Sequence, residues 1–461
     1  MSEVGRLLGK VGRGVRDPRR VWAKRGRICQ LAWRLPAQLG RGLLHPRRSW
    51  GRLRELMGPL PATEAPAAVP APTGRGYKRL AGAFGVNATG YLHADTGVGE
   101  GIRADIRMLK RSRLPFVVND IIRDGEAANL EQVDGAMVST DRPFAINLVH
   151  VNADQAGYFA GLAGPDYFRD RYTIAFWAWE LSEFPEAWQP AFQCYDEIWC
   201  QTTFVADAVA RCSPVPVVRI PFAVPERLEV AAGVDRSHFG LREGDFVFLF
   251  TFDYASFVER KNPLALIEAF SRAFPQERDV VLLLKTSRGE RNPEGQALLQ
   301  QAAAGCPVRF LDASLPRPEI NSLVSLCDCF VSLHRSEGFG AGLAEAMVAG
   351  KPVIATAYSG NMDFMNVANS FPVKYRLVEI ERDCGPYRKG RVWAEADLGH
   401  AAAQMRLVYD DRELARRVGE LGREQIVSQL GPVPVASMAR KRLLRIASRC
   451  GIEVPDDLAE G

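Results

Sequence analysis

The chain has 461 residues, enough for two or three domains, and its 47% hydrophobic and 25% charged content is ordinary for a soluble globular protein. No apolar run of about 18 residues occurs, so we expect no transmembrane helix. The basic N-terminus has no apolar stretch before a cleavage signal, so we expect no secretory leader. The nine cysteines include no CxxC pair and are odd in number, which favours free thiols and a cytoplasmic location.

The charge is divided unequally along the chain. Residues 1–60 hold fifteen Lys and Arg against three Asp and Glu, whereas the remainder holds 44 basic and 51 acidic residues. The segment PRRVW at 18–22 recurs as PRRSW at 46–50, which indicates a repeated short helical unit. We expect residues 1–58 to be a basic extension that meets an anionic membrane, peripherally on the inner face of the plasma membrane. The alternative is a disordered solubilising arm.

Proline and alanine dominate residues 59–76, which we interpret as a semi-rigid linker. From residue 77 onward, near-continuous apolar strands alternate with amphipathic helices, a pattern typical of parallel sheets covered on both faces. The first series forms an N-terminal domain over 77–235. Its expected strands are 78–86, 143–151, 172–179, 196–201 and 215–222, and its expected helices include 100–111 and 203–211.

A second series forms a C-terminal domain over 236–425, and residues 426–461 are expected to be helical. Its expected strands are 245–252, 279–285, 307–312, 328–334 and 351–356, with helices at 262–273, 294–304, 317–326 and 341–349. The fold class is therefore α/β, with two Rossmann-like doubly wound domains that face a ligand cleft.

The most informative segment is 336–356, SEGFGAGLAEAMVAGKPVIAT. Gly338, Gly340 and Gly342 remove side chains from the start of a helix, which leaves backbone amides and the positive dipole end open to an anion such as a diphosphate. Glu337 stands before this helix and Glu345 within it. An acid near a phosphate-binding helix is suited to ribose hydroxyls, and an acid before it to the hydroxyls of a transferred sugar.

This segment resembles the retaining glycosyltransferases of family 4, which have the GT-B fold. Their signature is two glutamates separated by seven residues, here EGFGAGLAE from Glu337 to Glu345. The resemblance extends over most of 77–425, and it is strongest to a bacterial subgroup that makes surface polysaccharides. It implies a hexosyltransferase that uses a nucleoside-diphosphate sugar and acts on a glycan or lipid-linked acceptor, with retention of anomeric configuration.

The resemblance also implies roles for individual residues. Lys261, with Arg260 beside it, is expected to contact the donor diphosphate, Glu337 the transferred sugar, and Glu345 the ribose. His150 is a candidate at the end of its strand, although a hydrogen-bonded structural histidine fits there as well. The expected donor-binding residues are Gly97, Gly99, Asp312, Ser314, Gly338, Phe339, Gly340, Ala341, Glu345 and Gly360. His334 and Arg335 are expected to line the same cleft.

Two departures from the family pattern leave alternatives open. Many relatives carry an arginine shortly before the position of Lys261, where this chain has YASFV. Many also carry a histidine after the strand at 172–179, where this chain offers Glu180 as a polar substitute. Trp177 and Trp179 form either a sugar-stacking wall or a buried strand end.

We therefore expect a metal-independent transferase with no cofactor beyond its nucleotide-sugar substrate and no nucleic-acid partner. No acidic pair has a convincing metal-binding context. The alternatives are a nucleotide-sugar epimerase of the same fold and a non-catalytic nucleotide-sugar-binding scaffold.

Overall fold

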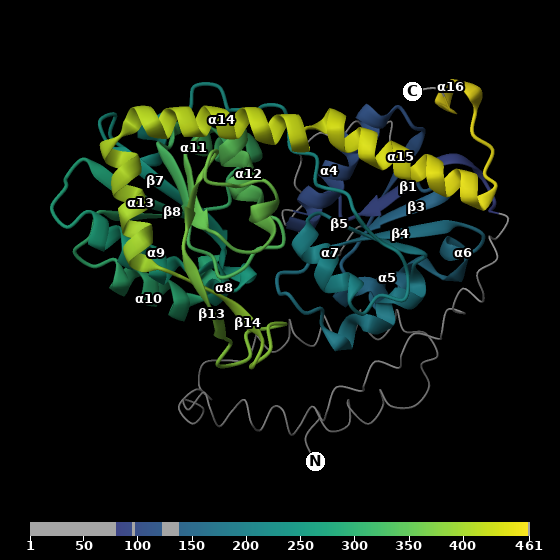
Figure 1. Cartoon of the computed structure of the whole chain (residues 1–461), viewed down its shortest axis with the longest axis horizontal. Coiled ribbons are helices and arrows are strands. Elements are labelled where there is room, and N and C mark those ends of the chain that lie inside the picture. The colour runs from purple at the N-terminus through teal and green to yellow at the C-terminus, as the bar shows by residue number, and fades with distance from the viewer. Residues whose placement is uncertain (1–79, 95–96, 122–137, 460–461) are drawn as a thin grey trace, which may run out of the picture. The chain divides into compact units, whose positions relative to one another are not determined.

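The computed structural model describes residues 80–94, 97–121 and 138–459. The expected basic extension (1–58) and linker (59–76) lie outside the described residues. The described residues form two six-stranded parallel sheets with helices around them (Figure 1), so the expected pair of Rossmann-like domains is confirmed. Within these ranges, no helix combines the length and apolarity that crossing a bilayer requires.

The N-terminal sheet has the strand order β2-β1-β3-β4-β5-β6. Its strands are almost wholly apolar and buried, as expected for strands covered on both faces. They are β1 (Ala83–Gly90), β2 (Phe116–Asp120), β3 (Phe144–His150), β4 (Tyr172–Trp177), β5 (Glu197–Cys200) and β6 (Val217–Arg219). The helices are α4 (Gly97–Ser112), α5 (Ala156–Ala163), α6 (Pro165–Phe168) and α7 (Thr203–Ala210). β2 was not expected from the sequence, and β1 begins at Ala83, later than the expected start at residue 78.

The C-terminal sheet has the strand order β12-β11-β10-β7-β8-β9. Its strands are β7 (Phe246–Asp253), β8 (Val280–Ser287), β9 (Val308–Asp312), β10 (Cys329–Ser332), β11 (Val353–Thr356) and β12 (Phe371–Val373). Its helices are α8 (Val258–Lys261), α9 (Pro263–Ala273), α10 (Pro293–Ala302), α11 (Arg317–Leu326), α12 (Ala341–Val348) and α13 (Leu398–Asp410). The five expected strands and four expected helices are present, and β12 was missed.

Both sheets contain a point at which the strand order reverses. In the first sheet it lies between β1 and β3, and in the second between β7 and β10. Connections leave the carboxyl ends of such neighbouring strands in opposite directions, which opens a crevice for ligands. His150 ends β3, and Gly97, Lys261 and Glu337 lie in the segments that follow β1, β7 and β10.

Two features lie outside the alternating pattern. An antiparallel hairpin, β13 (Tyr375–Glu379) with β14 (Val392–Ala396), follows the second sheet and was not expected from the sequence. Ile380, Cys384, Tyr387 and Trp393, on and between its strands, belong to an apolar cluster that consists mainly of N-terminal domain residues. The hairpin segment therefore contributes to the packing of both domains.

The chain ends with α14 (Arg412–Leu430), α15 (Pro432–Cys450) and the short α16 (Asp456–Ala459). The expected boundary between 425 and 426 lies inside α14. Gly431 ends α14 and Pro432 begins α15, because proline is favoured in the first helical turn, where its missing N–H has no partner. In Figure 1, α14 runs beside α12 of the second domain and α15 beside α4 of the first.

Candidate active site

A cavity of about 330 Å³ lies between the carboxyl ends of the two sheets. A second cavity of about 250 Å³ shares four lining residues with it and therefore adjoins it. The shared residues are Gly97, Thr251, Ala341 and Gly342. The first cavity brings together most of the expected site residues, namely Gly97, His150, Arg260, Lys261, Glu337, Gly338, Phe339, Gly340 and Ala341.

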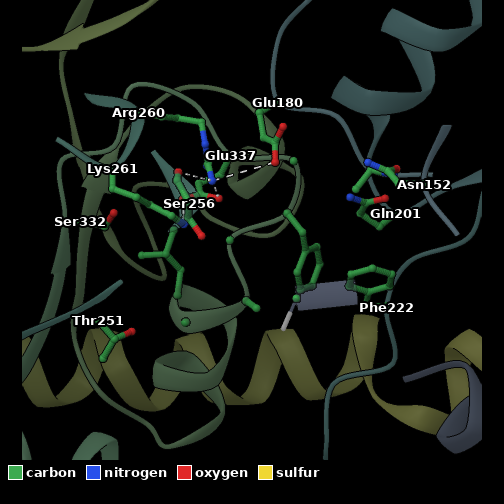
Figure 2. Close-up of a pocket in the computed structure, with 18 of the residues that line it drawn as sticks. Asn152, Glu180, Gln201, Phe222, Thr251, Ser256, Arg260, Lys261, Ser332 and Glu337 are labelled. Carbon is green, nitrogen blue, oxygen red and sulfur yellow. Dashed lines mark hydrogen bonds and ion pairs between the residues drawn. The ribbon is translucent and has the colours of Figure 1, made fainter. Parts of the chain in front are cut away.

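Glu337 is the centre of an ion cluster in the first cavity (Figure 2). Its carboxylate lies 2.5 Å from Lys261 Nζ and 2.9 Å from Arg260 Nη1. The Arg260 guanidinium also donates to the Ser336 carbonyl at 2.9 Å and lies 4.0 Å from the Glu180 carboxylate. The Tyr387 hydroxyl donates to the other oxygen of Glu180 at 3.0 Å. Glu180 of the N-terminal domain and Tyr387 of the hairpin segment therefore extend the ion cluster through Arg260, while Arg260 and Lys261 pair with the Glu337 carboxylate itself.

The local backbone explains how the two cations reach Glu337. The short helix α8 stops at Asn262, which adopts a left-handed conformation with φ of 56° that asparagine tolerates. Pro263 then starts α9 in a new direction. Arg260 and Lys261 consequently occupy the last turn of α8, beside the loop that carries Glu337.

The cluster governs the ionisation of its members. Burial alone would raise the pKa of Glu337, but the charges of Arg260 and Lys261 outweigh it and hold that pKa far below its ordinary range. Burial and the neighbouring Arg260 lower the pKa of Lys261, although Glu337 opposes that shift. Glu337 is therefore a carboxylate at neutral pH, with a cation on each of its oxygens.

The start of α12 faces the same cavity. Gly340 precedes the helix with φ of 90°, and no side chain caps the helix start. A Cβ at Gly338 would lie 2.9 Å from the Trp179 carbonyl, and one at Gly342 3.0 Å from the Phe330 ring. Glycine is thus required for close packing here, and the first amides of α12 stay open towards the cavity.

The expected glycine loop of the first domain is only partly at the cavity. Gly97, the first residue of α4, lines both cavities, and a Cβ there would meet nothing within 4 Å. Gly99 lines neither, and a Cβ there would lie 2.0 Å from the Ala94 carbonyl. Gly99 therefore permits the tight turn into α4 and presents nothing to the cavity.

The second cavity holds Glu345 and Ser314, as expected, together with Arg317, which forms an ion pair with Glu345. Asp312 lies outside both linings. Its carboxylate accepts from Thr286 Oγ1 at 3.0 Å and from the Gly289 amide at 3.4 Å. Gly360 also lies outside: its amide donates to the Glu337 carbonyl at 2.9 Å, and it packs directly against Gly338.

His150 lines the first cavity and is held on several sides. Its Nδ1 lies 2.7 Å from the Asp105 carboxylate, and its ring stacks on Phe176 with centroids 4.9 Å apart. Gly101 of α4 lies against the far edge of the ring, since a Cβ there would be 2.0 Å from Nε2. Burial raises the pKa of Asp105, with His150 opposing the shift. His150 is thus a hydrogen-bonded histidine at the end of its strand that also lines the cavity, and its catalytic role stays a prediction.

The structure decides between the two alternatives for Trp177 and Trp179, and it shows that His334 and Arg335 do not line the first cavity. Trp177 and Trp179 are buried among aromatic side chains and line neither of the two cavities, so they form a packed strand end and no sugar-stacking wall. His334 is fully buried beneath the cavity, with its ring nitrogens 3.1 Å from Ser332 Oγ and 3.2 Å from Asn361 Oδ1. Arg335 turns away to pair with Glu395.

The sequence analysis missed several residues at the site. Asn152, Gln201 and Phe222 line the first cavity from the N-terminal domain, and Arg317 lines the second. Asn152 and Gln201 directly follow strands that point at the cleft, which is a signal that could have found them. Arg317 gave no such signal, because it begins a helix after a proline-flanked loop. Among the described residues, no group of three or more His, Cys, Asp or Glu is placed to hold a metal ion.

Comparison with known families finds a match in the second half of the chain. Residues 234–425 match the family described as "Glycosyl transferases group 1". A segment of 172 residues is 26% identical to trehalose synthase of Rubrobacter xylanophilus. The matched segment covers 36% of this chain and 36% of that enzyme. The chain therefore spans about a third of the length of this curated relative.

Solved structures match over a larger part of the chain. HepE of Anabaena, crystallised with UDP and glucose, covers 78% of this chain and 100% of its own, with a TM-score of 0.57 and 14% identity. Sucrose-phosphate synthase of Thermosynechococcus elongatus covers 79% and 99%, with a TM-score of 0.58 and 15% identity. These likenesses show the GT-B fold. Together with the matched family, they support a glycosyltransferase.

Proposed function

We propose that this chain is a retaining glycosyltransferase of the family 4 type. It moves a hexose from a nucleoside-diphosphate sugar to a hydroxyl of a glycan or lipid-linked acceptor, in the synthesis of a cell-surface polysaccharide. The observation that carries the proposal is the Glu337 carboxylate, paired with Lys261 and Arg260, directly before the open start of α12 in the cavity between the domains.

The two adjoining cavities suit the two halves of the donor. The first offers the amides of α12, the ammonium group of Lys261 and Glu337, which match the diphosphate and the hydroxyls of the hexose. The second offers Glu345, whose carboxylate accepts hydrogen bonds from ribose hydroxyls. Arg317 now pairs with that carboxylate, so the ribose would share Glu345 with it or displace it.

In the proposed reaction, the bond between the anomeric carbon and the diphosphate oxygen breaks and a bond to the acceptor oxygen forms on the same face of the sugar. The acceptor hydroxyl gives its proton to the departing diphosphate oxygen. Negative charge develops on the diphosphate, where Lys261 and the α12 amides stabilise it. Glu337 is fixed as an anion by its two cations, so it orients the sugar and is assigned no role as an acid.

The first test measures thermal stabilisation of the chain by UDP, GDP, ADP and dTDP and their hexose derivatives, in the presence of EDTA. We expect one nucleotide to stabilise the protein selectively, and Glu345→Ala to remove most of that effect. The anomeric configuration of the product, read by NMR, tests retention. If one nucleotide sugar stabilises the wild type but no transfer is detected, the nucleotide-sugar-binding scaffold is favoured, and if no nucleotide stabilises it, the proposal fails.

The basic extension belongs to the same proposal. Its positive charge suits the anionic inner leaflet, where lipid-linked acceptors would be met. Deletion of residues 1–60 should move the protein from the membrane fraction to the soluble fraction. Unchanged partitioning would contradict this part of the proposal and leave the donor test untouched.

A further inference from the structure

Gln201 is the most unusual polar residue of the first cavity. It is 2% exposed and lines the cavity, and its side-chain oxygen is buried without a hydrogen-bond partner among the described residues. A buried amide oxygen that has lost water and gained no partner weakens folding, so such groups are rare in native proteins. The unused acceptor indicates a ligand at this point of the cavity.

Asn152 complements Gln201. The β4–β5 register pairs Trp177 with Cys200, so Ala178 and Gln201 leave the sheet at neighbouring positions. The Ala178 amide donates to Asn152 Oδ1 at 2.8 Å, which orients the side-chain amide of Asn152. Asn152 thus has its NH₂ group left to donate, while Gln201 has an oxygen left to accept. Figure 2 shows both residues on the side of the cavity away from Lys261.

The surroundings favour an uncharged sugar as the ligand. A hydroxyl group both donates and accepts, so it satisfies Gln201 and Asn152 together. Phe222 and Phe339, with ring centroids 5.3 Å apart, line the same cavity and offer an apolar surface to the C–H face of a sugar ring. The charges of the cavity are concentrated around Glu337, and neither amide belongs to that ion cluster.

We propose that Gln201 and Asn152 together bind a hydroxyl group of an uncharged sugar ring on the N-terminal side of the cleft. This assignment rests on the proposed transferase function for the source of the sugar, which is either the hexose of the donor or the acceptor. It does not rest on any particular nucleotide. Gly338 leaves room for the side chain of Gln201, because a Cβ at position 338 would lie 3.2 Å from Gln201 Nε2.

Two substitutions remove the hydrogen bonds while keeping the shape of the side chains. Gln201→Met deletes both polar atoms, and Asn152→Asp keeps the oxygen that Ala178 uses but deletes the donor. Gln201→Met should leave the melting temperature of the free protein unchanged or raise it, because the deleted oxygen has no partner. A residue with a purely structural role would lower it. Gln300→Met, on the exposed side of α10, is the matched control.

The binding test uses the full chain with methyl α-D-glucopyranoside as the probe, by saturation-transfer NMR with and without UDP. We expect each substitution to raise the Kd of the glucoside by about tenfold, the effect of one lost hydrogen bond in a buried site, while Gln300→Met leaves it unchanged. An unchanged Kd in Gln201→Met, or no glucoside binding by the wild type, would overturn the proposal.

A kinetic test distinguishes the two sources of the sugar and separates this proposal from the proposed function. Hydrolysis of UDP-glucose in the absence of acceptor reports on the donor, and transfer to octyl glucoside reports on the acceptor. A raised KM for hydrolysis assigns the pair to the donor hexose, and a raised KM only for the glucoside assigns it to the acceptor. Normal KM values in both reactions would overturn the proposal. If the wild type binds no nucleotide, the transferase function fails, and glucoside binding still decides the role of Gln201.

Discussion

The C-terminal wall of the cleft is organised by an ion cluster, whereas the N-terminal wall, apart from Glu180, presents mainly uncharged groups. On one side, Glu337 is paired with Lys261 and Arg260. On the other, Asn152, Gln201 and Phe222 present amides and an aromatic ring. A charged wall fits a group whose charge grows during the reaction, whereas a neutral wall fits a group that only has to be held. In terms of the proposed function, charge stabilisation belongs to the C-terminal domain, and the N-terminal domain shares with Glu337 the positioning of the sugar.

The largest effect is expected from breaking the charged wall. Glu337→Gln leaves Arg260 buried without its anion, which should lower the free energy of unfolding by about 3 kcal/mol. Turnover should fall by about a thousandfold, because the two cations and the sugar lose their common partner. Urea unfolding and initial rates measure the two effects. The control Glu413→Gln, in an exposed pair on α14, should leave the unfolding midpoint unchanged. Equal effects of the two substitutions would contradict a special role for the cluster.

The N-terminal side of the cleft is tested at His150, which lines the cavity beside the neutral wall. Gly101→Ala pushes a methyl group into the His150 ring, which Asp105 and Phe176 hold in place, and should lower the free energy of unfolding by about 1 to 2 kcal/mol. In a His150→Ala background the same change should become neutral or stabilising, since alanine is the better helix former. Thermal or urea unfolding of the double-mutant cycle measures this. A loss that persists without His150 would show that the ring is not what requires Gly101.

The pH dependence of stability concerns a residue directly behind the charged wall. Burial lowers the pKa of His334 from its ordinary value of 6.5. Below pH 6.5, His334 is protonated in the unfolded chain but stays neutral in the folded chain. The free energy of unfolding therefore falls as the pH falls. The slope from this residue is at most about 1.4 kcal/mol per pH unit. His334→Gln should flatten the curve of unfolding free energy between about pH 7 and about pH 5. Parallel curves for both proteins would refute the assignment.

The smallest effect sharpens the link between the walls. Tyr387→Phe removes the hydrogen bond to Glu180, which in turn lies beside Arg260. We expect a loss of about 1 kcal/mol in unfolding free energy and a drop of a few-fold in kcat, with KM for the donor nearly constant. Tyr409→Phe, whose hydroxyl contacts Asp279, is the control and should keep full activity. A change in KM alone would mean that Tyr387 contacts the substrate side instead of positioning Arg260.

The two walls also differ in how far the sequence predicted them. Glu337 lies in a recognisable glycine-rich segment and Lys261 was placed at the cleft by the family resemblance, whereas the ion pairs of Glu337 with Lys261 and Arg260 were not predicted. Asn152, Gln201 and Phe222 of the neutral wall follow β3, β5 and β6, and only the sheet register brings Asn152 and Gln201 to one place. Each of these residues carries the signal of its own strand end, but no local motif groups the three together.

Tertiary packing explains the remaining differences. Trp177 and Trp179 belong to an aromatic cluster that also includes Tyr387 and Trp393, about two hundred residues later, and no local pattern reveals such partners. The hairpin of β13 and β14 was missed because β13 is polar and largely exposed, without the apolar alternation of a half-buried strand. Asp312 follows its strand as expected, yet its carboxylate is used by Thr286 and Gly289.

The position of α15 bears on how the protein is made. Seven apolar side chains of this last long helix join β1, β3 and α4 in one core: Val435, Ala436, Ala439, Leu443, Ile446, Ala447 and Cys450. During synthesis on the ribosome, the first domain emerges long before these residues, and an N-terminal domain ordinarily folds while the rest is being translated. Here the first domain keeps an apolar surface uncovered until residues 432–450 have emerged. Nascent chains of this protein should therefore be clients of chaperones, and the loss of only its last thirty residues should make the first domain aggregate.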